Sequence, residues 1–545
     1  MDASNLFSPH GRPHPFPLPR RGRGLREKVA VPPPLPRRGR GLGVRVVVPP
    51  PLPGYRRGEG PGVRVVALAL CAILSACASG PDFHAPEPPG VPTYTGAPQP
   101  STTDSPPGPG GGAQHFVAAD ATGVAWWTSF GSPTLDSLVQ TALRNSPSMA
   151  QAEARLLQAQ ADYRVQAGAT QWPQVDASAS AARQKIDPAA FGIGNVLGNR
   201  SVPPFNLYSG KVEVSYTLDL FGANRRALEA LAAQVDYEAF ERDAARLTLA
   251  GNVVTTALRR ASLAKQIAVT QELLTDQERQ LDISDQRYRA GGISRQEFLG
   301  QRTQVELTRA SLPPLQTQLA QADHALAVYL GRPPAQLAST GGDDPAALDL
   351  DAIVLPAEVP VALPSVWAQQ RPDIRAAEAL LHQASANVGV ATANLYPQIT
   401  LNASMGPEAI RVGDWMNVWS IGAGIAQPIF HGGALLARRD SAQEAYDAAL
   451  ASYRLTVLQG LQQVADALRA LQQDAVEMQS RDQAQHDAQA SAEIAEQRYA
   501  AGGISQLALL DSQRQEMQTA LDRTRIQAQR LADTAALYQA LGTKP

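Results

Sequence analysis

The sequence contains little of what enzymes and cofactor-binding proteins need. Its only two cysteines, Cys71 and Cys77, precede residue 78, so a processed chain would contain no disulfide. None of its eight histidines belongs to HExxH or another metal-binding spacing. The GxxxxGK[ST] phosphate loop is also missing, so the chain would not drive transport with a nucleotide. We therefore expect no catalysis, no cofactor and no metal site.

Aromatic residues and charge of one sign are also scarce. Aromatics make up 6% and charged residues 18% of the chain, whereas alanine and glutamine are abundant. This composition favours helices over a β-rich core. The net charge of −2 combines +10 up to Ala76 with −12 in the remainder. A mildly acidic body argues against nucleic acid as a partner.

Residues 1–62 differ from the rest in composition. "PLP" recurs at Pro17, Pro34 and Pro51, within a stretch rich in proline, glycine and arginine. Such a stretch cannot pack a core, so we expect a disordered extension. We interpret it as a translated repeat upstream of the true start. The alternative is an arginine-rich tail that binds nucleic acid.

The apolar run from Val65 to Leu74 follows Arg64 and has ten residues. That is the length of a signal peptide and too short for a membrane-spanning helix. The run ends in Leu-Ser-Ala-Cys, which resembles the lipobox of bacterial lipoproteins. Residues 63–76 would then be the signal peptide, and Cys77 would carry a lipid that anchors the chain without spanning the membrane. The alternative is an ordinary cleaved signal with an incidental cysteine.

Residues 77–133 would form the lipidated N-terminus and a linker rich in proline, glycine, serine and threonine. The resemblance to lipoproteins also implies sorting to the outer membrane. In that class an aspartate after the cysteine signals retention in the inner membrane, and here Ala78 follows it.

A nine-residue motif shows that the remaining chain is duplicated. "QRYRAGGIS" at 286–294 returns as "QRYAAGGIS" at 497–505. Upstream, "NSPSMAQAEARLLQAQA" parallels "QRPDIRAAEALLHQASA". We therefore expect two homologous halves, 134–331 and 363–542, joined by a connector at 332–362. A single duplication differs from a solenoid of many short repeats.

Each half carries two strand-like segments. In "KVEVSYTLDL" from Lys211 to Leu220, apolar and polar residues alternate strictly. The pattern fits a half-buried strand in a soluble sheet, and equally a transmembrane barrel strand with one face toward lipid. Trp415 and Trp419 in the second half suit an interfacial aromatic girdle. Four strands cannot close a barrel alone, and a sheet in lipid must close, so the membrane alternative requires an oligomer.

Long helical tracts dominate both halves. No proline occurs from Ala223 to Tyr288. In the second half, apolar residues recur with steps of three and four, which is the seam of a coiled coil: Leu461, Val464, Leu468, Leu471, Ala475 and Met478. Ile267, Leu274, Leu281 and Tyr288 recur every seventh position. We expect these stripes to pack the structure.

Each tract ends at a pair of glycines. Gly291-Gly292 and Gly502-Gly503 favour a turn over a helix. Ser294 and Ser505 follow at positions that can cap the returning helices. This explains two helical hairpins but not the near-identity of their turns.

The chain resembles the outer membrane factor family, the TolC-like exit ducts of tripartite efflux pumps. Within it, the lipoprotein branch that serves resistance-nodulation-division (RND) transporters, which includes NodT-like proteins, is the most similar. The resemblance rests on these features in this order: the lipobox followed by "GPDF", "WWTSF", "LDLFGANRRALEA", "QPIFHGG", and RYxxGxxS in both halves.

This resemblance implies a mainly helical fold with a membrane β-barrel contribution. Each subunit of a homotrimer would give four strands to a twelve-stranded barrel and its helices to a periplasmic tunnel. In this family the RYxxGxxS turns contact a periplasmic adaptor protein, which links the duct to an RND-type inner-membrane transporter. The matching residues here are Arg287, Tyr288, Gly291, Ser294, Arg498, Tyr499, Gly502 and Ser505.

Leu507, Asp511 and Arg514 match the positions that constrict the closed tunnel of related ducts. Spacings of four and seven place the three residues on one helix face. Three copies would form an apolar, a carboxylate and a guanidinium ring, and Asp–Arg pairing between subunits would hold the end shut. The alternative is a solvated charged face. The first half has Gly300 at the position of Asp511.

We therefore predict a passive outer-membrane exit duct for small molecules such as drugs, anchored by lipid, with its tunnel in the periplasm. The alternative is a structural or adhesive coiled-coil outer-membrane lipoprotein without a channel.

Overall fold

The computed structural model describes residues 79–87, 90–96, 100–118, 125–185, 203–337 and 347–542. All of them belong to the unit Leu68–Pro545. The predictions for residues 1–62, for the signal peptide 63–76 and for Cys77 lie outside the described residues.

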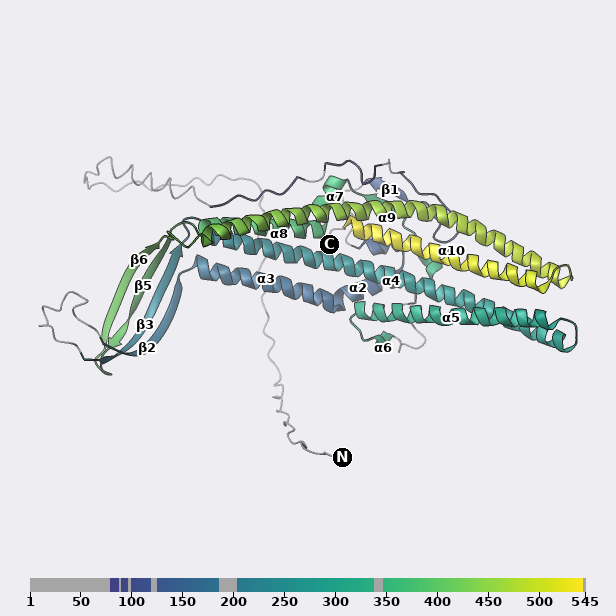
Figure 1. Ribbon diagram of the computed structural model, residues 1–545, viewed down its shortest axis with the longest axis horizontal. Coiled ribbons are helices and arrows are strands. Elements are labelled where there is room, and N and C mark those ends of the chain that lie inside the picture. The colour runs from purple at the N-terminus through teal and green to yellow at the C-terminus, as the bar shows by residue number, and fades with distance from the viewer. Residues whose placement is uncertain are drawn as a thin grey trace, which may run out of the picture. The chain divides into compact units, whose positions relative to one another are not determined.

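The two halves repeat one order of elements, as the duplicated motifs predict (Figure 1). The first half contains α2 (Pro133–Asn145), α3 (Pro147–Gln171), β2 (Gln174–Gln184), β3 (Phe205–Leu218), α4 (Ala223–Arg289) and α5 (Arg295–Tyr329). The second contains α7 (Pro364–Gln370), α8 (Pro372–Ala393), β5 (Gln398–Ala409), β6 (Met416–Ala426), α9 (Ala434–Ala500) and α10 (Gln506–Leu541).

Proline divides the first helical tract of each half. α2 ends before Pro147, and α7 ends before Pro372. The residue before a proline avoids the helical region, and Ser146 and Arg371 have ψ of 129° and 126°. The proline then occupies the first turn of the next helix, where no amide donor is needed.

The long helices α4 and α9 have 67 residues each and confirm the predicted tracts. The predicted seam of α9 faces inward: Val464, Leu471, Ala475 and Met478 are fully buried. In α4, Leu274 is buried against Val305 and Leu312 of α5. Tyr288 is the exception at the end of its stripe, because 36% of it is exposed.

A four-stranded antiparallel sheet has the order β2-β3-β5-β6. Its register separates polar from apolar side chains. One row across all four strands is Val175, Val214, Ala403 and Ile421, and the adjacent row on the other face is Asp176, Glu213, Ser404 and Ser420. The apolar face is exposed, with Trp419 at 70% and Ile421 at 79%. The alternation read from the sequence therefore extends over the whole sheet.

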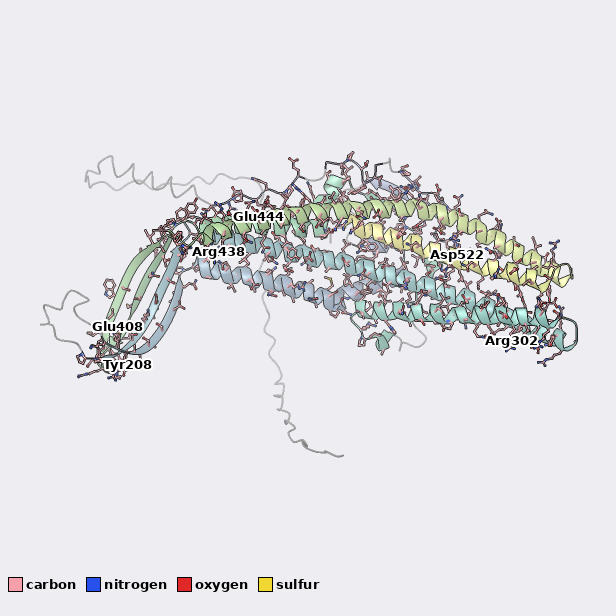
Figure 2. The ribbon with its side chains drawn as sticks, in the orientation of Figure 1. Tyr208, Arg302, Glu408, Arg438, Glu444 and Asp522 are labelled. Carbon is pink, nitrogen blue, oxygen red and sulfur yellow. The ribbon has the colours of Figure 1, made fainter. Side chains whose placement is uncertain are left out.

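The sheet and the two helical turns lie at opposite ends of α4 and α9 (Figure 1). Tyr208 and Glu408 mark the end of the sheet farther from the helices (Figure 2). Strand β3 ends at Leu218, two residues before the predicted end. Asp219 instead accepts hydrogen bonds from the amides of Asn224 and Arg225 at the start of α4, 3.1 and 2.9 Å long.

The middle of the helices carries short elements that we did not predict. Strands β1 (His115–Ala118) and β4 (Glu358–Val361) pair in parallel across the chain. They accompany η1 (Trp126–Phe130), α6 (Pro334–Leu337) and η3 (Leu350–Ala352). Two buried clusters lie here: one joins η1, α2, α4 and α10, and the other joins β4, α7, α9 and α10. The segments that flank the repeats thus bind the helices together.

Among the described residues, no helix combines the length and the apolar character needed to cross a membrane.

Candidate docking and constriction site at the hairpin turns

The turns after α4 and α9 close in the same way. The amide of Gly292 donates to the carbonyl of Arg287 over 2.8 Å, and the amide of Gly503 donates to that of Arg498 over 2.7 Å. Gly291 and Gly502 both have φ of 73°, in the left-handed region that side chains disfavour. The paired glycines therefore end both helices as predicted.

Serine caps both returning helices, but with different strength. Ser294 accepts from the amide of Glu297, and the Glu297 carboxylate accepts from the amide of Ser294 over 2.8 Å. This reciprocal capping box satisfies two amides. Ser505 accepts from the amide of Ala508 over 3.3 Å, and alanine offers no return bond. The second turn therefore has the weaker cap.

The side chains expected to dock an adaptor surround the two turns. Arg287, Tyr288 and Arg498 are exposed, and Tyr499 is half-buried. An Arg287 guanidinium nitrogen donates to the Tyr499 hydroxyl over 3.4 Å, so the turns are adjacent although 211 residues separate their sequences. A Cβ atom at Gly291 or Gly502 would meet no atom within 4 Å. Both turns thus offer open surface within one site.

Leu507, Asp511 and Arg514 share an exposed face of α10, as their spacing predicts. Leu507 is 67% exposed. An Asp511 carboxylate oxygen lies 3.3 Å from an Arg514 guanidinium nitrogen, with both side chains more than half exposed. Within one subunit the two residues therefore pair with each other.

A polar contact joins the two hairpins just above the turns, and we did not predict it. The Ser284 hydroxyl donates to the Gln301 side-chain oxygen over 2.5 Å, and the Gln506 amide donates to Ser284 over 3.1 Å and also to Gln301. All three side chains are buried. Glutamine on a helix resembles a surface residue in a sequence, so only the assembled hairpins reveal this contact.

A family model described as outer membrane efflux protein matches residues 138–332 and 363–543. The chain belongs to the outer membrane efflux protein family.

Individual relatives cover most of this efflux protein. The antibiotic efflux pump outer membrane protein ArpC of Pseudomonas putida is 33% identical over 488 residues, 88% of this chain and 95% of ArpC. The pyoverdine export outer membrane protein OpmQ of Pseudomonas putida (strain KT2440) is 32% identical over 421 residues, 76% of this chain and 87% of OpmQ.

The solved structure of the outer-membrane channel OprN superposes with a TM-score of 0.74 at 27% identity, covering 86% of this chain and 99% of OprN. This efflux protein is therefore an outer-membrane channel of the type that serves tripartite efflux pumps. The family is one of channels, and within the described ranges no group of acidic, histidine or cysteine side chains is placed to hold a metal ion.

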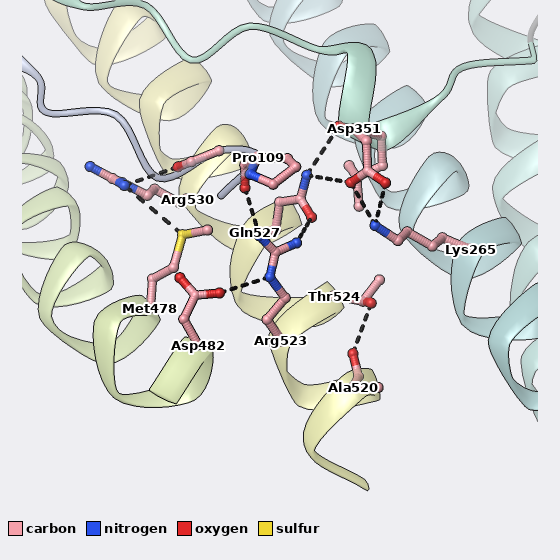
Figure 3. Close-up of polar contacts among 12 residues, drawn as sticks. Pro109, Lys265, Asp351, Met478, Asp482, Ala520, Arg523, Thr524, Gln527 and Arg530 are labelled. Atoms are coloured by element: carbon pink, nitrogen blue, oxygen red, sulfur yellow. Dashed lines mark hydrogen bonds and ion pairs between the residues drawn. The ribbon is translucent and has the colours of Figure 1, made fainter. Parts of the chain in front are cut away.

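A network of α10 side chains around Arg530 binds the N-terminal segment 100–118 of this efflux protein (Figure 3). Arg530 is fully buried and donates to the carbonyls of Gly110 and Gly112 over 2.9 and 2.8 Å, and to the Thr103 hydroxyl over 3.2 Å. Arg523 donates to the carbonyl of Pro109 over 3.0 Å and to the Asp482 carboxylate over 2.9 Å. We call these contacts the Arg530 network.

The Arg530 network extends from α10 to α4 (Figure 3). Gln527 donates to an Asp351 carboxylate oxygen over 3.1 Å, and the Lys265 ammonium lies 2.5 Å from the same group. Burial alone would raise the pKa of Asp351, but the hydrogen bonds from Lys265 and Gln527 outweigh it and lower the pKa. α10 is thus fixed to α4, α9 and segment 100–118 well above its turn.

Two carboxyl groups meet between α9 and α10 beside this network. Asp474 is 9% exposed and hydrogen-bonds Asp533. Burial, followed by this bond and the charge of Asp533, raises the pKa of Asp474 to about 8. The environment therefore favours one proton held by the Asp474–Asp533 pair. The sequence gives no signal for this pair, because two aspartates on separate helices are read as surface residues.

Proposed function

We propose that this efflux protein works as a homotrimer whose twelve strands close into one barrel in the outer membrane. The continuous apolar face of the four-stranded sheet supports this proposal most directly. The outer strands β2 and β6 have neighbours on one side only among the described residues. In lipid, unpaired strand edges are too costly to persist, so the sheet must close with strands of other copies. Two copies would give eight strands, whose interior side chains fill, whereas three copies give twelve strands and a wider interior.

The two turns form the docking site for a periplasmic adaptor, which joins the channel to an RND-type inner-membrane transporter. Their identical hydrogen-bond closure supports this assignment, because one partner surface would then recognise both. The docking residues are Arg287, Tyr288, Gly291, Ser294, Arg498, Tyr499, Gly502 and Ser505.

Leu507, Asp511 and Arg514 constrict the periplasmic entrance. In the trimer each Asp511 would exchange its partner within the subunit for an Arg514 of a neighbouring subunit. A ring of carboxylates favours cations over anions. The constriction belongs to the second hairpin because Gly300 replaces the acid in the first.

The cargo consists of small organic molecules that the inner-membrane transporter selects, and the channel conducts them passively. Relatives named for antibiotic efflux and for pyoverdine export support a cargo of small organic molecules. Residues 134–331 and 363–542 form the two repeats of the channel, 332–362 connects them, and lipid on Cys77 anchors residues 77–133 to the outer membrane.

Single-channel conductance in a planar bilayer tests the duct and its constriction together. The purified mature protein is compared with an Asp511→Ala, Arg514→Ala variant. An Asp522→Ala, Arg525→Ala variant is the matched control, since these residues form another 3.3 Å pair three positions apart on α10. We expect a small, cation-biased conductance that rises only in the first variant.

Equal conductance in all three proteins would retain the duct and refute the constriction. If none of them conducts and no trimer forms in detergent, the protein is instead a structural or adhesive coiled-coil lipoprotein.

A further inference from the structure

The motif "GPDF" at residues 80–83 packs against the helices rather than continuing as a free linker. The amide of Ser79 donates to the carbonyl of Phe221 over 3.1 Å, directly after β3. Gly80 touches Gly389 of α8 so closely that a Cβ atom at Gly80 would lie 2.4 Å from the Gly389 Cα. Gly80 also has φ of 92°. Gly80 therefore has to be glycine, and a Cβ atom at Gly389 would lie 2.8 Å from the Arg226 Cγ and 3.0 Å from the Ser79 carbonyl oxygen.

A buried arginine receives the next residues of the segment. The Arg226 side chain on α4 is only 6% exposed and lies 2.7 Å from the carboxylates of both Asp82 and Glu229. It also donates to the carbonyl of Ser79 over 3.3 Å. Segment 79–83 thus covers a cation that would otherwise face solvent.

The same contacts continue to α8. The other Glu229 oxygen lies 2.8 Å from the imidazole of His382. The Phe83 ring stacks on His382 with centroids 4.4 Å apart and planes 13° from parallel. Segment 79–83, α4 and α8 therefore form a closed ring of contacts. We call Arg226, Glu229, His382 and Gly389 the anchor site.

The hydrogen bonds among these residues favour the charged forms of Arg226 and Glu229. Burial would lower the pKa of Arg226, but hydrogen bonds with Asp82 and Glu229 outweigh it and raise the pKa. Burial would raise the pKa of Glu229, but His382 and Arg226 outweigh it and lower the pKa. The site is therefore built for a carboxylate at position 82.

The anchor site lies where the sheet meets the helices. Phe221, which receives the Ser79 amide, stacks on Tyr396 at 4.8 Å, and these rings lie between β3 and α4 and between α8 and β5. Ser79 is the second residue after Cys77. An acyl group on Cys77 would thus start within two residues of the base of the membrane sheet.

We propose that the anchor site binds residues 79–83 as a docked peptide. Through this docking, the lipid on Cys77 promotes assembly of the subunit into the trimer. The inference rests on the proposed lipidation and goes beyond it. The acyl chain fixes the segment at the membrane surface, and the docked segment fixes the starts of α4 and β5 relative to that surface. The strand pairs then meet those of other subunits at a common height.

Charge reversal tests the docking. Asp82→Arg places a second cation against buried Arg226, and Arg226→Asp places a second acid beside Asp82 and Glu229. The double variant restores one Asp82–Arg226 attraction with exchanged positions. Glu87→Arg makes the same charge change at an exposed position five residues further along. Each variant is made in the full-length chain and again with Cys77→Ala.

The measurement is the fraction of outer-membrane protein that migrates as a heat-labile trimer, with the mass of the N-terminal peptide as a second readout. We expect Asp82→Arg to lower the trimer fraction about threefold, because Arg226 loses its bond to Asp82 and faces a like charge, whereas solvent screens part of this repulsion at position 82, whose side chain is 82% exposed. The double variant should recover most of it, and Glu87→Arg should match the unmodified sequence. With Cys77→Ala, Asp82→Arg should cause no further loss.

A trimer fraction unchanged by Asp82→Arg, or no recovery in the double variant, would overturn the docking. An equal loss with and without Cys77 would show that the segment only adds packing, and would overturn the link to lipid. An unacylated Cys77 in the unmodified protein would overturn this inference while leaving the duct intact, which conductance measures separately.

Discussion

Substituting Gly291 and Gly502 together separates the proposed docking function of the turns from the stability of the channel. Both glycines have φ of 73°, where an ordinary L-residue costs about 1–2 kcal/mol. No atom lies within 4 Å of a Cβ at either position, so the Cβ atom itself adds no clash to this strain. The two substitutions together should therefore cost about 2–4 kcal/mol per subunit.

This cost should leave the channel assembled, because the turns contribute no residue to the two large buried clusters. Asparagine tolerates the left-handed conformation better than other side chains, so Gly291→Asn, Gly502→Asn adds bulk with the least strain. Leucine at both positions adds bulk and strain. Gly292→Ala, Gly503→Ala is the control, since its Cβ atoms would lie at an ordinary 3.4 Å from the nearest carbonyl oxygen.

The assay is efflux-dependent growth in the presence of a toxic substrate, with trimer abundance measured in the same cells. We expect the asparagine and leucine variants to reduce resistance to the level of cells without the channel, at unchanged trimer abundance. The alanine control should retain resistance. Normal resistance in the leucine variant would refute docking at these turns, and a parallel loss of trimer would show that the turns act through folding.

Three further predictions concern α9 and α10. The pKa of Asp474 is about 8 in the folded protein and about 4 in the unfolded chain. Between these two pH values the folded protein binds more protons than the unfolded chain, so the free energy of unfolding should fall as the pH rises from about 4 to about 8. Asp474→Asn should remove this dependence and raise the melting temperature at pH 8 by a few degrees; identical melting curves would contradict the assignment. Arg530→Met should leave the carbonyls of Gly110 and Gly112 without their hydrogen-bond donor. It should therefore lower the melting temperature by several degrees and expose segment 100–118 to proteases, whereas Arg525→Met on the same helix should do neither. Ala508→Glu should complete the second capping box, stabilise that turn by about 0.5–1 kcal/mol and slow hydrogen exchange at its first amides; unchanged exchange would refute the comparison with Glu297.

Local chemistry made the turns, the long helices and the sheet predictable from the sequence. Paired glycines before a serine dictate a helix end and a new cap regardless of their surroundings, and both occur as expected. The alternation in β3 depends only on side-chain polarity along one strand. The helix breaks at Pro147 and Pro372 were predictable by the same reasoning, since the residue before each proline is visible in the sequence.

Contacts between distant segments explain what the sequence did not reveal. Strands β1 and β4 have four residues each and are separated by more than two hundred residues, so neither shows a recognisable period. Arg226 and Arg530 resemble solvated helix residues until the N-terminal segment covers them. Asp511 and Arg514 could be placed on one face, but their partners in an assembled channel depend on copies of the chain that the sequence of one subunit does not position.

The duplicated halves are alike where they would meet the same partner and differ where they would not. The turn residues from Arg287 to Ser294 and their counterparts from Arg498 to Ser505 share one backbone closure. Directly after the turns, Glu297, Phe298 and Gly300 correspond to Ala508, Leu509 and Asp511. These replacements remove the capping box and the Tyr288–Phe298 stack from the second hairpin and add the charge of the proposed constriction. The first hairpin is thus the more firmly closed of the two, and the second combines a weaker cap with the exposed Asp511–Arg514 pair of the proposed constriction.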